Sequence, residues 1–376
     1  MFRFLILIII LFFLYNSWQT FEKHLGNNEL SKGLDYIDSL KNNPEVKSTI
    51  NSLYLEIQDS LKQVEKQFIQ SQQSPQQKEL RKEEEIKLGK PSKQVFSVFN
   101  VELGNQKKDI VKSLGPAERS SLNEYGTKWY AYHDHYHNFF MVMYDETNKA
   151  AGLYTNEDII SSSNGIKLGS SKKEVRAQLG EPLSRIQKGL VYYQVQGNED
   201  YDVFLVDNTY TTIFYDKHEG NTVTALLLIS KDLESKKMGI YTEANQALKE
   251  GFEYQLFDLT NASRVNYGLP VLTWDQHVRD TARKHSKDMA VNEYFDHTNL
   301  QGKSPFDRMK EDHILFHLAG ENLAYGQFSS IFAHEGLMNS LGHRENILRK
   351  DYEFLGVGVA FNQESQPYYT ENFYAK

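Results

Sequence analysis

The chain of 376 residues contains no cysteine. This absence excludes disulfide bonds, thiolate metal sites, a cysteine nucleophile and a lipidated amino-terminal cysteine. The fold must therefore be held together by packing and hydrogen bonds rather than by covalent cross-links.

An excess of positive charge is also lacking. The chain has 50 Asp and Glu residues against 42 Lys and Arg residues, which gives a formal net charge of −8. Surfaces that bind nucleic acid ordinarily carry clustered positive charge. We therefore expect no nucleic-acid partner.

The amino-terminal apolar run, residues 4–15, is shorter than the span of about 20 apolar residues that a membrane-crossing helix usually needs. It has the length of a signal sequence, and no small-x-small cleavage pattern follows it. This favours an uncleaved signal anchor in residues 1–20 over a removed signal peptide. We expect an exported protein, either anchored to the cell membrane with its bulk outside or secreted if the segment is cleaved.

Residues 21–92 are polar, with leucine and isoleucine at intervals near three and four, a spacing that predicts a helical stalk. The low-complexity run QSQQSPQQ at 70–77 predicts a linker. We interpret this region as a spacer between the membrane and the folded part, with self-association through the apolar stripe as the alternative.

Residues 93–232 contain an internal repeat. The runs VELG at 101–104 and IVKSLGP at 110–116 recur as IKLG at 166–169 and VRAQLGEP at 175–182. Each copy predicts a strand with a glycine turn, then a short helix that ends at Leu-Gly, and then three strands. The predicted strands are 128–132, 139–144 and 150–154 in the first copy, and 190–193, 211–215 and 223–229 in the second. The pattern predicts two β-α-β-β-β units.

The first copy also contains the run HDHYH at 133–137. Alternate histidines on a strand share one side of it, a geometry that is open to metal binding. The alternative is a solvated hairpin tip, which the absence of histidines from the second copy favours.

Residues 243–376 begin with an amphipathic pattern that predicts helices over 247–265 and 276–291. Two alternating apolar runs, 355–361 and 367–373, predict a pair of closing strands. Between these elements lie FDHT at 295–298, AGENLA at 319–324 and MNSLGHRENIL at 338–348.

This combination of runs resembles the CAP superfamily of cysteine-rich secretory proteins, antigen 5 and pathogenesis-related 1 proteins. It is most similar to the bacterial branch, which the absence of cysteine also fits. The repeat region resembles the CAP-associated N-terminal domain that precedes some bacterial CAP domains. The resemblance implies an α+β protein, in which a carboxy-terminal α-β-α sandwich follows the duplicated module and the helical stalk.

The resemblance further implies a cleft lined by two histidines and two glutamates, in which the imidazoles of several relatives bind zinc or another divalent cation. His297 and His343 match the histidines, and Glu321 matches the first glutamate. Glu335 is the candidate for the second, with Glu345 as the alternative. Neutral imidazoles coordinate such cations, while carboxylates orient the imidazoles or complete the coordination sphere.

Three functions remain open for this cleft. The leading one is an envelope or extracellular module that binds a divalent cation or a small polar ligand. The second is a metal-assisted hydrolase of peptide or envelope polymer, with Glu321 and Glu335 as the catalytic candidates. The third, lipid binding, is known within the superfamily. No His-Glu-x-x-His run supports the hydrolase.

A purely structural interpretation is that the four residues form a satisfied polar network. Ser340, Asn322 and Asn346 are then expected to be turn and capping residues. The remaining histidines of this region, His313, His317 and His334, are expected at the surface or in packing positions.

Overall fold

The computed structural model describes residues 87–195 and 200–376. The predicted signal segment, and the predicted stalk up to residue 86, lie outside the described residues. Within the described part, no helix is both long and apolar enough to cross a membrane.

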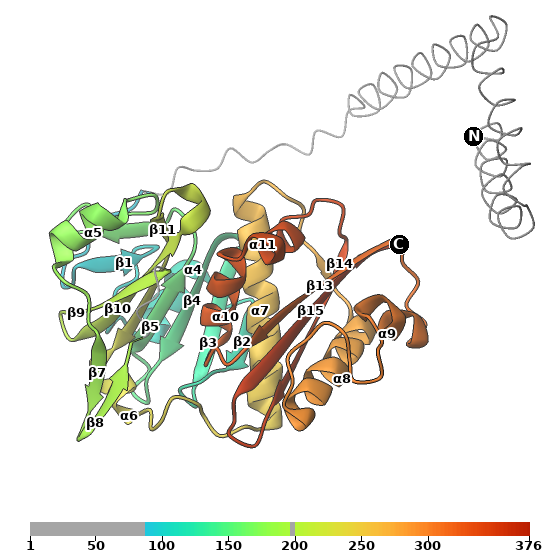
Figure 1. The fold of residues 1–376 in the computed structure, drawn as a ribbon. Helices are drawn as coiled ribbons and strands as arrows, with labels where there is room; N and C mark the ends of the chain where they lie inside the picture. Colours follow the sequence, from blue (N-terminus) through green and yellow to red (C-terminus); the bar gives the residue numbers. More distant parts are fainter. Residues whose placement is uncertain (1–86, 196–199) are drawn as a thin grey trace, which may run out of the picture. The chain divides into compact units, whose positions relative to one another are not determined.

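The first half of the described chain is built around an antiparallel sheet of seven strands (Figure 1). In spatial order these are β2 (Arg119–Leu122), β3 (Lys128–Asp134), β4 (His137–Tyr144), β5 (Ala150–Thr155), β11 (Thr222–Ser230), β10 (Thr209–Asp216) and β9 (Tyr201–Val206). The pairing of β5 with β11 joins the two copies of the repeat into one sheet.

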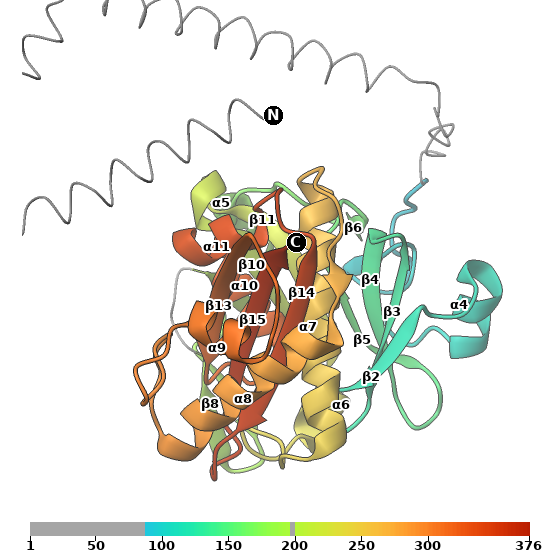
Figure 2. The ribbon, with the colours of Figure 1, turned by 90° about the vertical axis from the view of Figure 1, so that its right-hand side faces the viewer.

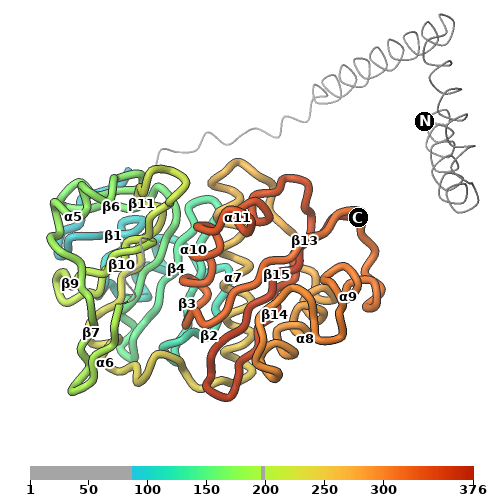
Figure 3. The backbone as a smooth tube through the Cα atoms, viewed as in Figure 1, coloured from blue at the N-terminus to red at the C-terminus, as the bar shows by residue number. Residues whose placement is uncertain are grey.

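Shorter elements of the same half flank this sheet. They are β1 (Phe96–Val98), α4 (Lys107–Leu114), β6 (Ile160–Ser162), α5 (Lys172–Leu179), β7 (Arg185–Lys188), β8 (Val191–Gln194), η1 (Lys217–Glu219) and α6 (Lys231–Lys236). The tube in Figure 3 follows the chain through both copies. Helices α4 and α5 end at Gly115 and Gly180, the two glycines that the repeat predicted as helix ends.

After its helix, each copy contains more strands than the three that were predicted there. The first copy adds β2, and the second adds β7 and β9. The opening strands β1 and β6 begin before the predicted ones and pair antiparallel with each other.

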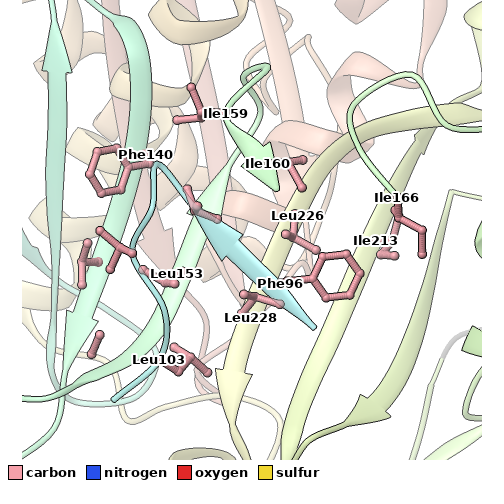
Figure 4. Close-up of a cluster of buried hydrophobic side chains, with 14 of the residues drawn as sticks. Phe96, Leu103, Phe140, Leu153, Ile159, Ile160, Ile166, Ile213, Leu226 and Leu228 are labelled. Carbon is pink, nitrogen blue, oxygen red and sulfur yellow. The ribbon is translucent and has the colours of Figure 1, made fainter. Parts of the chain in front are cut away.

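The central sheet is buried on both faces. Successive side chains of a strand point to opposite faces, so one strand contributes to two hydrophobic cores. On β11, Leu226 and Leu228 belong to one hydrophobic core, and Leu227 and Ile229 belong to another. Figure 4 shows the first core, where Phe96 of β1 lies near Leu226 and Leu228 of β11.

The second half of the chain has a sheet of four strands with helices on both faces. Its strands, in spatial order, are β12 (Thr273–Trp274), β14 (Phe354–Phe361), β15 (Pro367–Ala375) and β13 (Leu318–Tyr325). Its helices are α7 (Gln246–Asn266), α8 (Gln276–Asn292), α9 (Pro305–Glu311), α10 (Ser330–Met338) and α11 (Leu341–Ile347).

Strand β14 shows why this half is a sandwich. A Cβ atom at Gly356 or Gly358 would lie within 2.3 Å of the α8 backbone, so the absent side chains let this helix lie directly on the strand. The alternating residues Val357 and Val359 point to the other face, where they pack in one core with Leu256 of α7. The predicted α+β fold with an α-β-α sandwich is confirmed.

Helix α7 lies between the two sheets (Figures 1 and 2). One side of it packs on β14, and another packs on β2 and β4. Leu259 and Ala262 of α7 share a buried cluster with Trp129 of β3. The two halves are therefore parts of one compact unit.

Candidate functional site

Two of the predicted site residues, His297 and Glu321, form a hydrogen-bonded pair. Glu321 lies on β13, and its side chain is 1% exposed, whereas His297 lies in the loop before α9 and its side chain is 50% exposed. The distance from His297 Nδ1 to Glu321 Oε1 is 2.9 Å. Because a carboxylate only accepts hydrogen bonds, Nδ1 carries the proton, and Nε2 of the neutral imidazole has a free lone pair.

Arg308 fixes both members of this pair. Its Nη2 donates to Glu321 Oε2 at 2.6 Å, and its Nη1 donates to the His297 carbonyl oxygen at 2.7 Å. Sequence reasoning missed this residue. A signal was available, because Ser304 and Asp307 form a capping box that starts α9 and places Arg308 in its first turns.

His343, the second predicted histidine, lies on α11 and is partly buried. Its Nδ1 shares a hydrogen bond of 2.7 Å with the hydroxyl of Ser340. Burial lowers the pKa of His343, and the charge of His297 lowers it further. Helix α11 is joined to the strand of Glu321, because Asn346 Nδ2 donates to the Glu321 carbonyl oxygen at 3.3 Å.

The pKa of His297 shifts in the opposite direction. The hydrogen bond to Glu321 is the largest cause and raises it, and burial opposes the rise. The carboxylate therefore stabilises the protonated imidazole, so a cation at Nε2 must compete with a proton.

Glu335 does not join the His297–Glu321 pair. It lies on α10, and its Oε1 accepts a hydrogen bond of 2.6 Å from the hydroxyl of Tyr154 on β5. Burial raises its pKa to about 7. The alternative glutamate, Glu345, is exposed on α11. The second glutamate of the predicted cleft is thus not supplied by Glu335, because α10 turns this side chain toward the seven-stranded sheet.

A different buried glutamate, Glu371 of β15, belongs to the hydrogen-bond network at this site. It accepts hydrogen bonds from the Thr260 hydroxyl at 2.8 Å and from Asn322 Nδ2 at 3.1 Å. Asn322 also donates to the carbonyl oxygen of His343 at 3.1 Å. Asn322 is therefore a buried strand residue, and its expected role in a turn or cap is wrong. The run containing Glu371 predicted a strand but gave no sign of this contact.

The other residues of the expected polar network differ in their roles. Ser340 precedes α11 as its cap residue, although its hydroxyl bonds to His343 rather than to the helix backbone. Asn346 donates from Nδ2 to Asn322 Oδ1 at 3.0 Å. His334 is a packing residue, fully buried with its Nε2 2.7 Å from Ser263 Oγ.

The described residues contain no group of three or more His, Cys, Asp or Glu side chains arranged to hold a metal ion. Glu321, the carboxylate nearest to His297, is already engaged by Arg308. Any cation held here would therefore have two imidazoles as protein ligands and would complete its coordination with water or a bound molecule.

The three histidines at 133–137 do not share one side of a strand. His135 and Tyr136 have positive φ values of 49° and 67° and form the tight turn between β3 and β4. His133 accepts a hydrogen bond at Nδ1 from the backbone N–H of Tyr136 and stacks on its ring. The run therefore forms the tip of a β-hairpin, as the alternative interpretation of the sequence predicted.

Comparisons with known proteins agree with this architecture. Residues 257–373 match the cysteine-rich secretory protein family, and residues 103–240 match the CAP-associated N-terminal domain. The chain is 30% identical over 289 residues to the Bacillus subtilis membrane protein YlbC, a match that covers 72% of this chain and 82% of that protein. It is also 40% identical over 125 residues to YkwD of the same organism, covering 33% of this chain and 48% of YkwD.

Two solved structures share the fold across both halves. An extracellular protein containing an SCP domain from Bacillus anthracis is 25% identical with a TM-score of 0.63, and the match covers 73% of this chain and 94% of that one. A cysteine-rich secretory protein from Staphylococcus aureus is 17% identical with a TM-score of 0.60, covering 76% of this chain and 95% of that one.

Proposed function

Because the chain belongs to the cysteine-rich secretory protein family, with a CAP-associated domain before its CAP domain, we propose that it is an exported, envelope-associated binding protein. In this proposal the imidazoles of His297 and His343 hold a divalent cation such as zinc.

The orientation of His297 carries the proposal. Imidazoles that bind metal ions commonly donate their second N–H to a carboxylate, which fixes the tautomer and the ring orientation. His297 donates in this way to Glu321, and Arg308 holds that carboxylate in place. The arrangement leaves Nε2 of a half-exposed imidazole available as a ligand.

The donor set also indicates what the cation would do. Two protein ligands leave coordination positions open, so a small polar ligand with an oxygen or nitrogen donor can complete the sphere. Hydrolysis would instead need a free carboxylate as a base. Both oxygens of Glu321 are occupied, by His297 and Arg308, so we propose binding rather than turnover.

The proposed location follows from the relatives. One is named a membrane protein and another an extracellular protein. Together with the expected signal anchor, these names support a protein held at the outer side of the cell membrane.

Zinc titration of the full-length chain by calorimetry tests the cation site. We expect saturable binding in the wild type that is lost in His297→Ala and in His343→Ala. His277→Ala is the matched control, because this histidine is exposed on α8. Binding that persists in both site variants, or no binding to the wild type, would contradict the proposal and leave the pair as a structural network.

A further inference from the structure

A cavity lies between the CAP-associated domain and the CAP domain. Its volume is about 440 Å³, within the range of small-molecule sites. Both domains line it, through β9, β10 and the β7–β8 hairpin on one side and α10 with the loop before it on the other. None of the proposed cation-site residues His297, Glu321 and His343 is among its lining residues.

Aromatic side chains form much of the wall. Six of them are Tyr193, Tyr201, Tyr210, Phe214, Phe328 and Phe332. Phe332 of α10 meets the rings of Tyr201 and Phe214 edge-on, each with a centroid distance of 5.2 Å. Rings from both domains therefore pack together along this wall.

Most charged groups of the wall already have partners. Lys188 forms an ion pair with Glu234, which also accepts a hydrogen bond of 2.6 Å from the Tyr125 hydroxyl. Lys237 donates to the carbonyl oxygen of Ile240 at 2.8 Å, and its ammonium group lies 4.4 Å from the Phe328 ring centroid. The wall thus already holds one cation against an aromatic face.

Glu335 is the exception. It is 4% exposed and lines the cavity, and its Oε1 accepts a hydrogen bond from the Tyr154 hydroxyl. Within the described part of the chain, no Lys, Arg or His side chain forms an ion pair with this carboxyl group. Phe332 lies one turn earlier on α10. The adjacent Gly336 also lines the cavity, and a Cβ atom there would meet nothing within 4 Å.

We propose that this cavity is a second binding site, and that it takes a small organic ammonium ion. A buried carboxylate without a counter-charge is costly, and a cation would remove that cost. Aromatic faces attract cations, most strongly where water is excluded. The ammonium group would lie beside Glu335 and the rest of the ligand among the rings. An anionic ligand would be repelled by Glu335.

The site is tested with choline, with n-butylammonium, and with 3,3-dimethylbutan-1-ol, which has the shape of choline without its charge. Saturation-transfer NMR titrations of the full-length chain measure each affinity at pH 8, where Glu335 with its pKa of about 7 is mostly ionised. We expect both ammonium ions to bind, and choline to bind at least about tenfold more tightly than the alcohol.

Two variants test separately the charge of Glu335 and the open volume at Gly336. Glu335→Gln keeps the shape and should weaken choline binding at least about tenfold, with little change for the alcohol. Gly336→Leu should abolish binding of both choline and the alcohol by filling the open volume, while thermal melting shows that the fold is kept.

His297→Ala should leave both affinities unchanged, which separates this site from the proposed cation site. The proposal is overturned if neither ammonium ion binds, or if choline binding survives both Glu335→Gln and Gly336→Leu.

Discussion

At the scale of single residues, Glu321 sets the protonation of His297. Its carboxylate raises the pKa of that imidazole above the usual value, while Arg308 opposes the rise. In Glu321→Gln the carboxylate is lost and the arginine charge remains, so we expect the pKa of His297 to fall. NMR titration of the His297 ring proton measures it, with exposed His277 as the internal reference.

The same substitution has a predicted effect on stability. A histidine whose pKa is raised on folding stabilises the protein below its unfolded pKa, and that contribution disappears as the pH rises through the folded pKa. Glu321→Gln should therefore lower the free energy of unfolding more at pH 5 than at pH 8. Equal losses at both pH values in urea unfolding would show that the pair does not carry this coupling.

Burial of Glu371 also makes the stability of the wild type fall as the pH rises. Burial raises its pKa to about 7, although Thr260 and Asn322 donate hydrogen bonds to it. A carboxyl whose pKa is raised on folding costs stability as the pH rises from its ordinary value of 4.5 through 7. Glutamine does not titrate, so Glu371→Gln should gain up to about 3 kcal/mol relative to wild type between pH 4 and pH 8. Urea unfolding at the two pH values measures this, and a constant difference would contradict it.

At the scale of elements, two helical glycines have opposite surroundings. A Cβ atom at Gly251 of α7 would lie 2.0 Å from the carbonyl oxygen of Leu122 on β2, whereas one at Gly336 of α10 would meet nothing within 4 Å. Alanine favours a helix over glycine by up to about 1 kcal/mol at either position. Gly336→Ala should therefore stabilise the protein by up to that amount, and Gly251→Ala should destabilise it by about 1–3 kcal/mol. Thermal unfolding of the two variants compares them directly, and a gain in both would mean that α7 and β2 can separate without cost.

Elements whose signals are local were predictable from the sequence. Helices α4 and α5 end at the Leu-Gly pairs that mark them, and β14 and β15 follow their alternating apolar runs. Strands β2, β7 and β9 were missed, because their pairing depends on partners that local patterns do not specify.

The site residues also divide into those that short sequence motifs predict and those whose position depends on distant contacts. The short runs around His297, Glu321 and His343 resemble family motifs. Hydrogen bonds join Glu321 to His297 and to Asn346 of α11, the helix that carries His343. The position of Glu335 depends on Tyr154, which is 181 residues away in the chain. No spacing within residues 319–348 could reveal that contact.

At the scale of the whole molecule, the CAP domain and the domain before it depend on each other. Asp258 of α7 is buried and accepts hydrogen bonds from Arg119 of β2 and from the Tyr136 hydroxyl at the β3–β4 turn, both at 2.9 Å. Tyr154 and Glu335 form a second buried contact across the same interface. Both carboxylates have raised pKa values because burial removes them from water, so each relies on donors from the other domain.

We therefore expect residues 87–376 to unfold as one cooperative unit. Residues 243–376 alone would expose Leu259, Ala262 and Ile331, which are buried against the seven-stranded sheet in the intact protein. Loss of that burial costs on the order of several kcal/mol, so the isolated CAP domain should melt at a lower temperature than the longer fragment. Differential scanning calorimetry of the longer fragment should show a single transition with equal calorimetric and van't Hoff enthalpies. Two separate transitions, the upper one coinciding with that of residues 243–376 alone, would show that the interface contributes little and that each domain is stable by itself.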